Sequence, residues 1–140
     1  MDAKEYLSRA FYLHKQIKAK EKRLEWLRDI APGPSMRFSE EAKVPGNPRS
    51  SAVETAAIKV VALEEEIAND IISFVDVTKE ISGIISGISS QEQKTVLEMR
   101  YLAFMEWEEV AGRMGYTLRH TFYLHGKALG SIKNLIPISA

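Results

Sequence analysis

Basic and aromatic side chains cluster near the end of the chain, at spacings that would put them on one side of a helix. From Tyr116 onward the chain carries three cationic residues and no acidic one. At 100° per residue, the outward side of a helix in this stretch would present the following residues: Arg119, His120, Tyr123, Gly126 and Lys127, with Phe122 at its margin. Cations of this kind contact phosphate oxygens or guanine, and aromatic side chains contact thymine methyl groups. The sequence therefore offers a candidate DNA-binding face.

Phe122 and Tyr123 also have a second interpretation. Aromatic residues at helical spacing are more often part of a core or a protein interface than of a DNA-reading surface. If they lie exposed beside few basic residues, the same face favours a protein partner instead of base pairs. Both interpretations of the face stay open at the level of the sequence.

The other side chains with chemical potential give little support to catalysis or metal binding. The three histidines, His14, His120 and His125, are too scattered for a zinc site, and the chain has no cysteine. The acidic runs at 64–66 and 106–109 are typical of solvated helix faces, and no phosphate-binding loop or nucleophile motif is present. We therefore expect no catalytic residues, no metal and no cofactor.

Two short helices joined by a tight turn are predicted to position the candidate face. The first spans Glu106 to Met114, Gly115 ends it, Thr117 caps the next, and the second runs from Leu118 to about Ile132. The predicted inward residues are Val110, Ala111 and Met114 on the first helix, and Thr121, Leu124, Ala128 and Ile132 on the second. This is the pattern of a helix–turn–helix. A preceding helix from Glu92 to Arg100, capped by Ser90, is predicted to bury Val96, Leu97 and Tyr101.

Two longer amphipathic helices precede this unit. Asp2 and Glu5 resemble a capping box, and a first apolar stripe follows with Lys20 as its one polar interruption: Tyr6, Ala10, Leu13, Ile17, Leu24 and Leu27. After a cap at Ser50 or Ser51, a second and longer stripe has Thr78 in its one gap: Val53, Ala56, Val60, Leu63, Ile67, Ile71, Phe74, Ile81, Ile85 and Ile88. Proline and glycine between Ala31 and Ser50 exclude a continuous helix there and predict a loop.

These elements predict an all-α protein, in which a long antiparallel helical hairpin, a coiled coil, precedes a helix–turn–helix head. We place the hairpin at residues 1–88 and the head at 89–140, with a hinge near Gly83 and Gly87. The longer second stripe should extend beyond the first helix and meet either the head or a second subunit. We therefore expect a homo-oligomer, a dimer, formed through the long helices.

Charge and hydropathy limit the partners and the cellular location that we expect for the protein. Basic and acidic residues both number 19, so affinity for nucleic acid would depend on local charge and on help from dimerisation or a partner. The most apolar run, Ile67 to Ile88, contains four charged residues and is not a membrane span. No signal-like segment opens the chain, so we expect a cytoplasmic protein without a membrane partner.

The stretch from Ser89 to Ile132 resembles region 4 of the primary bacterial sigma factors. The matching motifs are Val96-Leu97-Glu98-Met99-Arg100, Glu108-Glu109-Val110-Ala111, Gly115-Tyr116-Thr117 and Lys127-Ala128-Leu129, with no gap from Gly115 to Leu129. The resemblance implies a second helix that reads promoter DNA and a module that also contacts RNA polymerase. Thr121 departs from the pattern, because the family prefers an aliphatic residue there, and this helix has fewer basic residues than a strong promoter reader.

The whole chain is similar to small phage and prophage proteins of Gram-positive bacteria, near the ArpU and RinA type of late-gene transcription regulator. The resemblance implies a phage-encoded regulator in the bacterial cytoplasm that binds double-stranded promoter or operator DNA, with host RNA polymerase as a second partner. One alternative is a protein-interaction module that acts on such a host protein without reading bases. Another is a DNA-packaging factor like a small terminase subunit, which also joins a DNA-binding motif to oligomerising helices.

Overall fold

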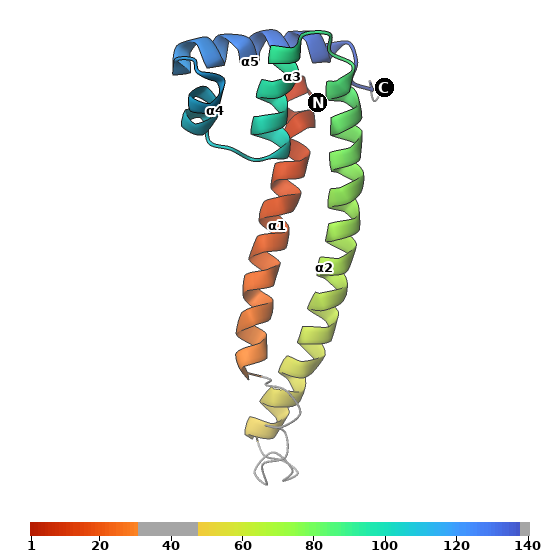
Figure 1. Cartoon of the computed structure of the whole chain (residues 1–140). Coiled ribbons are helices and arrows are strands. Elements are labelled where there is room, and N and C mark those ends of the chain that lie inside the picture. The colour runs from red at the N-terminus through yellow and green to blue at the C-terminus, as the bar shows by residue number, and fades with distance from the viewer. Residues whose placement is uncertain (31–47, 138–140) are drawn as a thin grey trace. The chain divides into compact units, whose positions relative to one another are not determined.

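The chain folds into helices, as the sequence predicts. A computed structural model describes residues 1–30 and 48–137 (Figure 1). Its elements are α1 (Ala3–Ile30), α2 (Pro48–Ser86), α3 (Gln91–Leu97), the π-helix η3 (Glu98–Leu102), α4 (Trp107–Met114) and α5 (Leu118–Lys133). The predicted all-α fold is confirmed, with a long helical hairpin followed by shorter helices.

The chain forms two compact units, and the boundaries between them fall inside the two long helices. Unit 1 comprises Met1–His14 and Ser73–Ala140, and unit 2 comprises Lys15–Ile72. The two long helices, α1 and α2, each contribute residues to both units. The ends of α1 and α2 in unit 1 therefore belong with the C-terminal helices.

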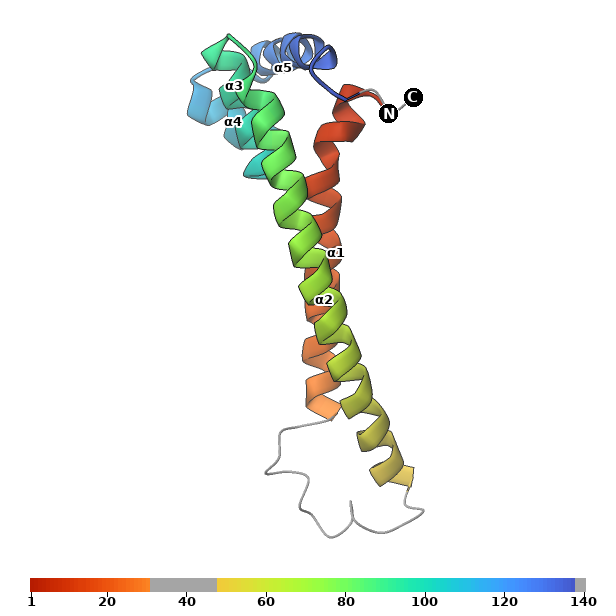
Figure 2. The ribbon, with the colours of Figure 1, turned by 90° about the vertical axis from the view of Figure 1, so that its right-hand side faces the viewer.

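Unit 2 is an antiparallel helix pair (Figure 2), and ion pairs join its two helices. Lys20 Nζ lies 2.7 Å from Asp70 Oδ2 and 3.4 Å from Glu66 Oε1, while Arg28 Nη2 lies 3.0 Å from Glu64 Oε2. The hydrogen bond to Asp70 raises the pKa of Lys20. The buried apolar residues of the unit are Ile17, Leu24, Ala56, Leu63 and Ile67. Lys20 interrupts the apolar stripe, as predicted, and its partner Asp70 completes the seam.

The start and middle of α2 differ from the prediction. The sequence predicts a loop up to Ser50, but the helix begins at Pro48, because the first turn of a helix needs no amide hydrogen from proline. The remainder of the predicted loop, residues 31–47, lies outside the described residues. Ile71 belongs to the predicted apolar stripe but is 45% exposed, since the alternation of three and four residues after Ile67 selects Asp70 for the seam.

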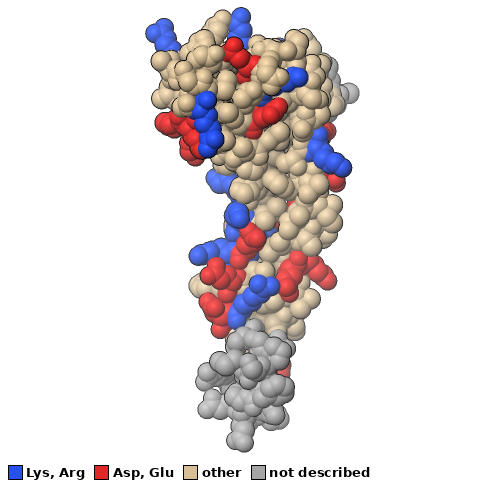
Figure 3. All heavy atoms as spheres, viewed as in Figure 1, with Lys and Arg blue, Asp and Glu red and all other residues tan. Residues whose placement is uncertain are grey.

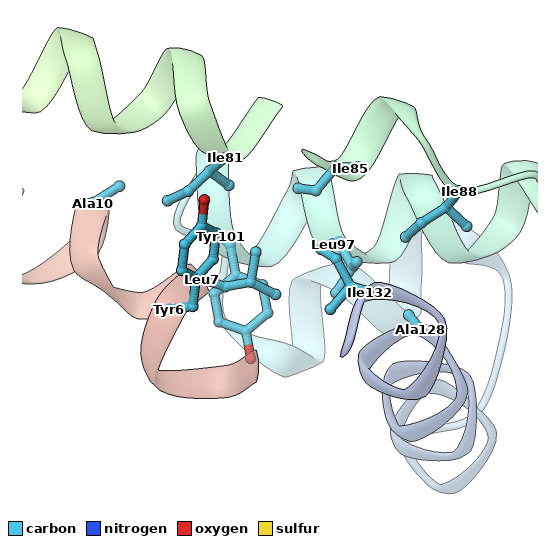
Figure 4. Close-up of a cluster of buried hydrophobic side chains, with 10 residues drawn as sticks. All are labelled: Tyr6, Leu7, Ala10, Ile81, Ile85, Ile88, Leu97, Tyr101, Ala128 and Ile132. Carbon is cyan, nitrogen blue, oxygen red and sulfur yellow. The ribbon is translucent and has the colours of Figure 1, made fainter. Parts of the chain in front are cut away.

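Unit 1 has a single core to which most of its helices contribute (Figure 4). Ile81, Ile85 and Ile88 from the end of α2 and the segment after it pack with residues of α3, η3 and α5. The buried members of this cluster are Tyr6, Leu7, Ala10, Ile81, Ile85, Ile88, Leu97, Tyr101, Ala128 and Ile132. The end of the second apolar stripe therefore meets the C-terminal helices, which is one of the two alternatives that the sequence left open. Leu7, absent from the predicted stripe, is fully buried in this core.

The passage from α3 to α4 is irregular. The third helix widens into the π-helix η3, and Phe104 then adopts a positive φ of 58°. Arg100 stabilises this passage, because its Nη1 donates a hydrogen bond to the Met105 carbonyl oxygen at 2.9 Å. A left-handed backbone at a bulky residue is costly, so the passage depends on the contacts around it.

Candidate nucleic-acid interface

The turn between α4 and α5 has the predicted residues in the predicted roles. Gly115 ends α4 in the left-handed conformation, with φ 74° and ψ 28°. The Tyr116 amide then donates to the Ala111 carbonyl oxygen at 3.0 Å, which satisfies a carbonyl at the end of α4. Thr117 caps α5 by accepting a hydrogen bond from the His120 amide at 3.1 Å. The two helices and this turn form a helix–turn–helix.

One side of α5 is buried against α3, α4 and the unit 1 core. Ala128 and Ile132 have no exposed surface, and neither has Thr121. The Thr121 hydroxyl donates to the Thr117 carbonyl oxygen at 2.8 Å, so the hydroxyl hydrogen is satisfied within the helix. Contacts of α5 with α3 and α4 fix this side inward. The opposite side must therefore face solvent or a ligand.

The exposed side of α5 carries all five residues of the candidate DNA-binding face. These are Arg119, His120, Phe122, Tyr123 and Lys127. Phe122 is 47% exposed and Tyr123 is 57% exposed, and Leu118 beside them is 40% exposed. The structure thus brings the predicted residues together on one surface.

Contacts within this face join one of its cations, Lys127, to its aromatic rings. Lys127 Nζ lies 5.4 Å from the centre of the Tyr123 ring, and the Tyr123 and His120 rings stack with centroids 6.0 Å apart. Tyr116 continues the series, edge-on to His120 at 4.5 Å. The hydrogen bond that the Tyr116 hydroxyl donates to Glu92 raises the pKa of that hydroxyl. An ordered row of rings beside a cation limits the freedom that binding would have to remove.

A second group of aromatic side chains, Trp107 and His125, packs next to Phe122. No pattern in the sequence indicates this group. The Phe122 ring lies edge-on to Trp107 at 5.2 Å, and Trp107 lies edge-on to His125 at 4.6 Å. The Arg100 guanidinium lies 4.8 Å from the centre of the Trp107 ring. Residues of η3, α4 and α5 meet here, and only the fold brings them together. We call Arg100, Tyr101, Trp107 and His125 the buttress.

Burial shifts the pKa values of two residues of the buttress, Tyr101 and His125. Tyr101 Oη and His125 Nε2 are 2.6 Å apart. Burial, together with the charges of Lys4 and Arg100, lowers the pKa of His125 to about 4. Burial also raises the pKa of Tyr101 to about 12. Near neutral pH the imidazole is therefore neutral, and its Nε2 can accept the tyrosine hydroxyl proton in a hydrogen bond.

Charges of both signs surround the interface. Figure 3 shows acidic and basic side chains interspersed over the C-terminal helices on one face of the molecule. Glu108 and Glu109 lie exposed in the first turn of α4, and Glu109 Oε1 lies 3.3 Å from Arg113 Nη2. The first turn of α5, in contrast, has no acidic residue. DNA approaching from the α4 side would meet carboxylates.

Side chains of the metal-ligating types do not gather anywhere in the described part of the chain. In residues 1–30 and 48–137, no three of them lie close enough to hold a metal ion. None of the helices within those same ranges has an apolar stretch long enough to cross a membrane.

Fold and site together define an all-α protein with a helical hairpin and a C-terminal helix–turn–helix. A family model described as "Protein of unknown function (DUF1492)" matches residues 35–133, more than two thirds of the chain. The chain therefore belongs to the DUF1492 family. No curated protein and no solved structure gives a significant match.

Proposed function

We propose that the protein is a DNA-binding transcription regulator that places the exposed side of α5 in the major groove. The observation that carries this proposal is the division of α5 into a buried side and a side with Arg119 and Lys127. The resemblance to sigma region 4 and to late-gene regulators of phages supports promoter or operator DNA as the ligand. The proposal places the protein in the cytoplasm of a bacterial host and gives it no catalytic role.

The roles of individual residues follow from their chemistry. Arg119, in the first turn of α5, has the donor geometry to contact a guanine edge or a phosphate. Lys127, two turns further along, is a phosphate ligand. Tyr123 and Phe122 present ring surface to a thymine methyl group. Because few cations take part, binding by one copy should be modest and sensitive to salt.

Selection from a randomised duplex library at low salt tests this function. We expect an enriched motif, and binding weakened roughly tenfold by Arg119→Ala or by Lys127→Ala. Arg119→Ala should also relax the preference at one base pair, whereas Lys127→Ala should weaken all sequences alike. Lys59→Ala, which removes an exposed lysine of unit 2, is the matched control and should bind like the wild type. The absence of any enriched motif would refute sequence-specific binding.

The exposure of the aromatic residues supports a second candidate function. Leu118, Phe122 and Tyr123 form apolar surface beside only two cations, which is a composition typical of protein interfaces. In this function the face binds a host protein such as RNA polymerase without reading bases. Phe122→Ala and Tyr123→Ala would then abolish binding to purified, nuclease-treated polymerase, while Arg119→Ala would leave it largely intact. The opposite ranking of the variants would favour DNA as the ligand.

A further inference from the structure

A second apolar stripe runs along α2, on the side away from the buried seam. Its members recur at steps of three and four residues, and Glu65 occupies the one polar position. We call these residues the α2 strip: Ile58, Val61, Ala68, Ile72 and Val75. Their large side chains are widely exposed, at 71% for Ile58, 58% for Val61 and 61% for Ile72. The same helix buries Ala56, Leu63 and Ile67 on its other side, so α2 is apolar on two sides.

A helix with two apolar sides normally packs on both. Uncharged side chains cover much of α2 on the face shown in Figure 3, with charged side chains toward both ends of that surface. Large apolar side chains exposed along one side of a helix mark an interaction site in a folded protein. We propose that the occupant is the α2 strip of a second copy of this chain, packed antiparallel to the first.

The strip is self-complementary in the antiparallel orientation. If Val61 packs against the partner's Ile72, the same alignment puts Ile58 against the partner's Val75. Glu65 then lies against the partner's Ala68, where a small side chain leaves room for the carboxylate to reach water. All of these positions belong to one continuous helix, α2.

Charges at the two ends of the strip match in the same alignment. Glu54 lies one step before Ile58, and Lys79 lies one step after Val75 on that side of the helix. Both side chains are exposed, and neither has an ion-pair partner within the described residues. In the antiparallel pair each Glu54 meets the partner's Lys79, which gives one ion pair at each end.

The parallel alternative brings like charges together. It would put Glu65 against the partner's Glu65 in the middle of the apolar surface, and Lys79 against the partner's Lys79 at one end. Like charges that face each other across a dry interface are strongly unfavourable. Charge complementarity therefore selects the antiparallel orientation.

Sedimentation of the full chain over a range of concentrations tests whether the α2 strip holds two copies together in a dimer. The wild type should be dimeric, and Val61→Asp or Ile72→Asp should weaken the dimer roughly a hundredfold or more, because each dimer then buries two uncompensated charges. Both residues are more than half exposed in one copy, so circular dichroism should show that the variants still fold. Ser73→Asp adds the same charge next to Ile72 but off the strip, and it should leave the dimer unchanged. A wild type that stays monomeric, or that forms a ring of many copies, would overturn the proposal.

A charge exchange tests the orientation. Lys79→Glu should weaken the dimer, because a carboxylate at position 79 then faces the carboxylate of the partner's Glu54. Adding Glu54→Lys to the same chain should restore the dimer. In a parallel dimer the second substitution would have no reason to rescue the first. Failure of the rescue, with both variants folded, would contradict the antiparallel alignment.

Cross-linking gives an independent answer, because the chain has no native cysteine. A mixture of Val61→Cys and Ile72→Cys chains should form disulfides between the two variants, and neither variant alone should cross-link efficiently. Efficient cross-linking within each variant alone would instead show parallel pairing. The result does not depend on whether α5 binds DNA or protein, since neither ligand is present in the experiment.

Discussion

Two polar residues at apolar positions show how individual side chains are accommodated. Thr121 stands where the sigma family prefers an aliphatic residue, and Lys20 interrupts the apolar stripe of α1. The Thr121 hydroxyl donates to a carbonyl one turn earlier, and the Lys20 ammonium pairs with Asp70. A buried polar group is costly only while its hydrogen-bonding capacity is unmet. The departure at Thr121 is therefore compatible with a well-packed helix–turn–helix.

His125 should make the stability of the protein sensitive to mild acid. Its pKa is lowered from 6.5 to about 4. Between these two pH values the imidazole is therefore protonated in the unfolded chain but neutral in the folded chain. The free energy of unfolding should be highest above pH 6.5 and should fall as the pH drops from 6.5 toward 4. Without screening the loss would be about 3 kcal/mol, and partial exposure should reduce it to about 1–2 kcal/mol.

Urea denaturation at several pH values, compared between wild type and His125→Gln, measures this effect. Glutamine stays neutral and can accept a hydrogen bond from the Tyr101 hydroxyl, so the difference in stability between the two proteins should shrink as the pH falls. His120→Gln changes an exposed histidine and should follow the wild-type curve. A constant difference between wild type and His125→Gln across this range would mean that the imidazole is not kept neutral by the fold.

At the scale of the elements, local signals predict most of the helices. Capping residues and the αL glycine are recognisable from the chain alone, since their effect depends on neighbours within four positions. These local patterns do not predict the exposure of Ile71. A step of three residues after Ile67, in place of four, puts Asp70 between the two helices and leaves Ile71 exposed. The widening at η3 and the positive φ of Phe104 have no local sequence signal. They arise where several helices converge, as does the buttress beneath Phe122.

Two glycine substitutions should separate the turn from the helices. Gly115→Ala should destabilise the protein by about 1 kcal/mol, because Gly115 has a φ of 74° and no neighbouring atom obstructs an added methyl group. Gly130→Ala adds the same methyl group in open space within α5 and should stabilise the protein by about 0.5–1 kcal/mol. Thermal denaturation of both variants measures the contrast. Equal shifts in the same direction would show that the turn does not need the left-handed conformation.

At the scale of the whole molecule, a net charge of zero limits how DNA can be held. The cations on and beside the exposed side of α5 are Arg119, Lys127 and Lys133. Three phosphate contacts would give a slope of roughly −3 for log affinity against log salt concentration. The sequence leads us to expect that dimerisation adds affinity, and the proposed antiparallel pairing changes what a dimer can do.

Antiparallel pairing of the α2 strip places the two Lys79 positions at opposite ends of the shared segment. The segment from Glu54 to Lys79 spans about 38 Å of helix. Because a dimer carries two copies of α5, we expect it to be able to join two separate duplexes. Beads carrying one operator duplex should retain a second, fluorescent duplex in the presence of wild-type protein. Val61→Asp should lose this bridging while a single duplex still binds with a salt slope of roughly −3. A slope twice as steep for the wild type as for Val61→Asp on one short duplex would show that both copies grip the same DNA, and it would contradict bridging.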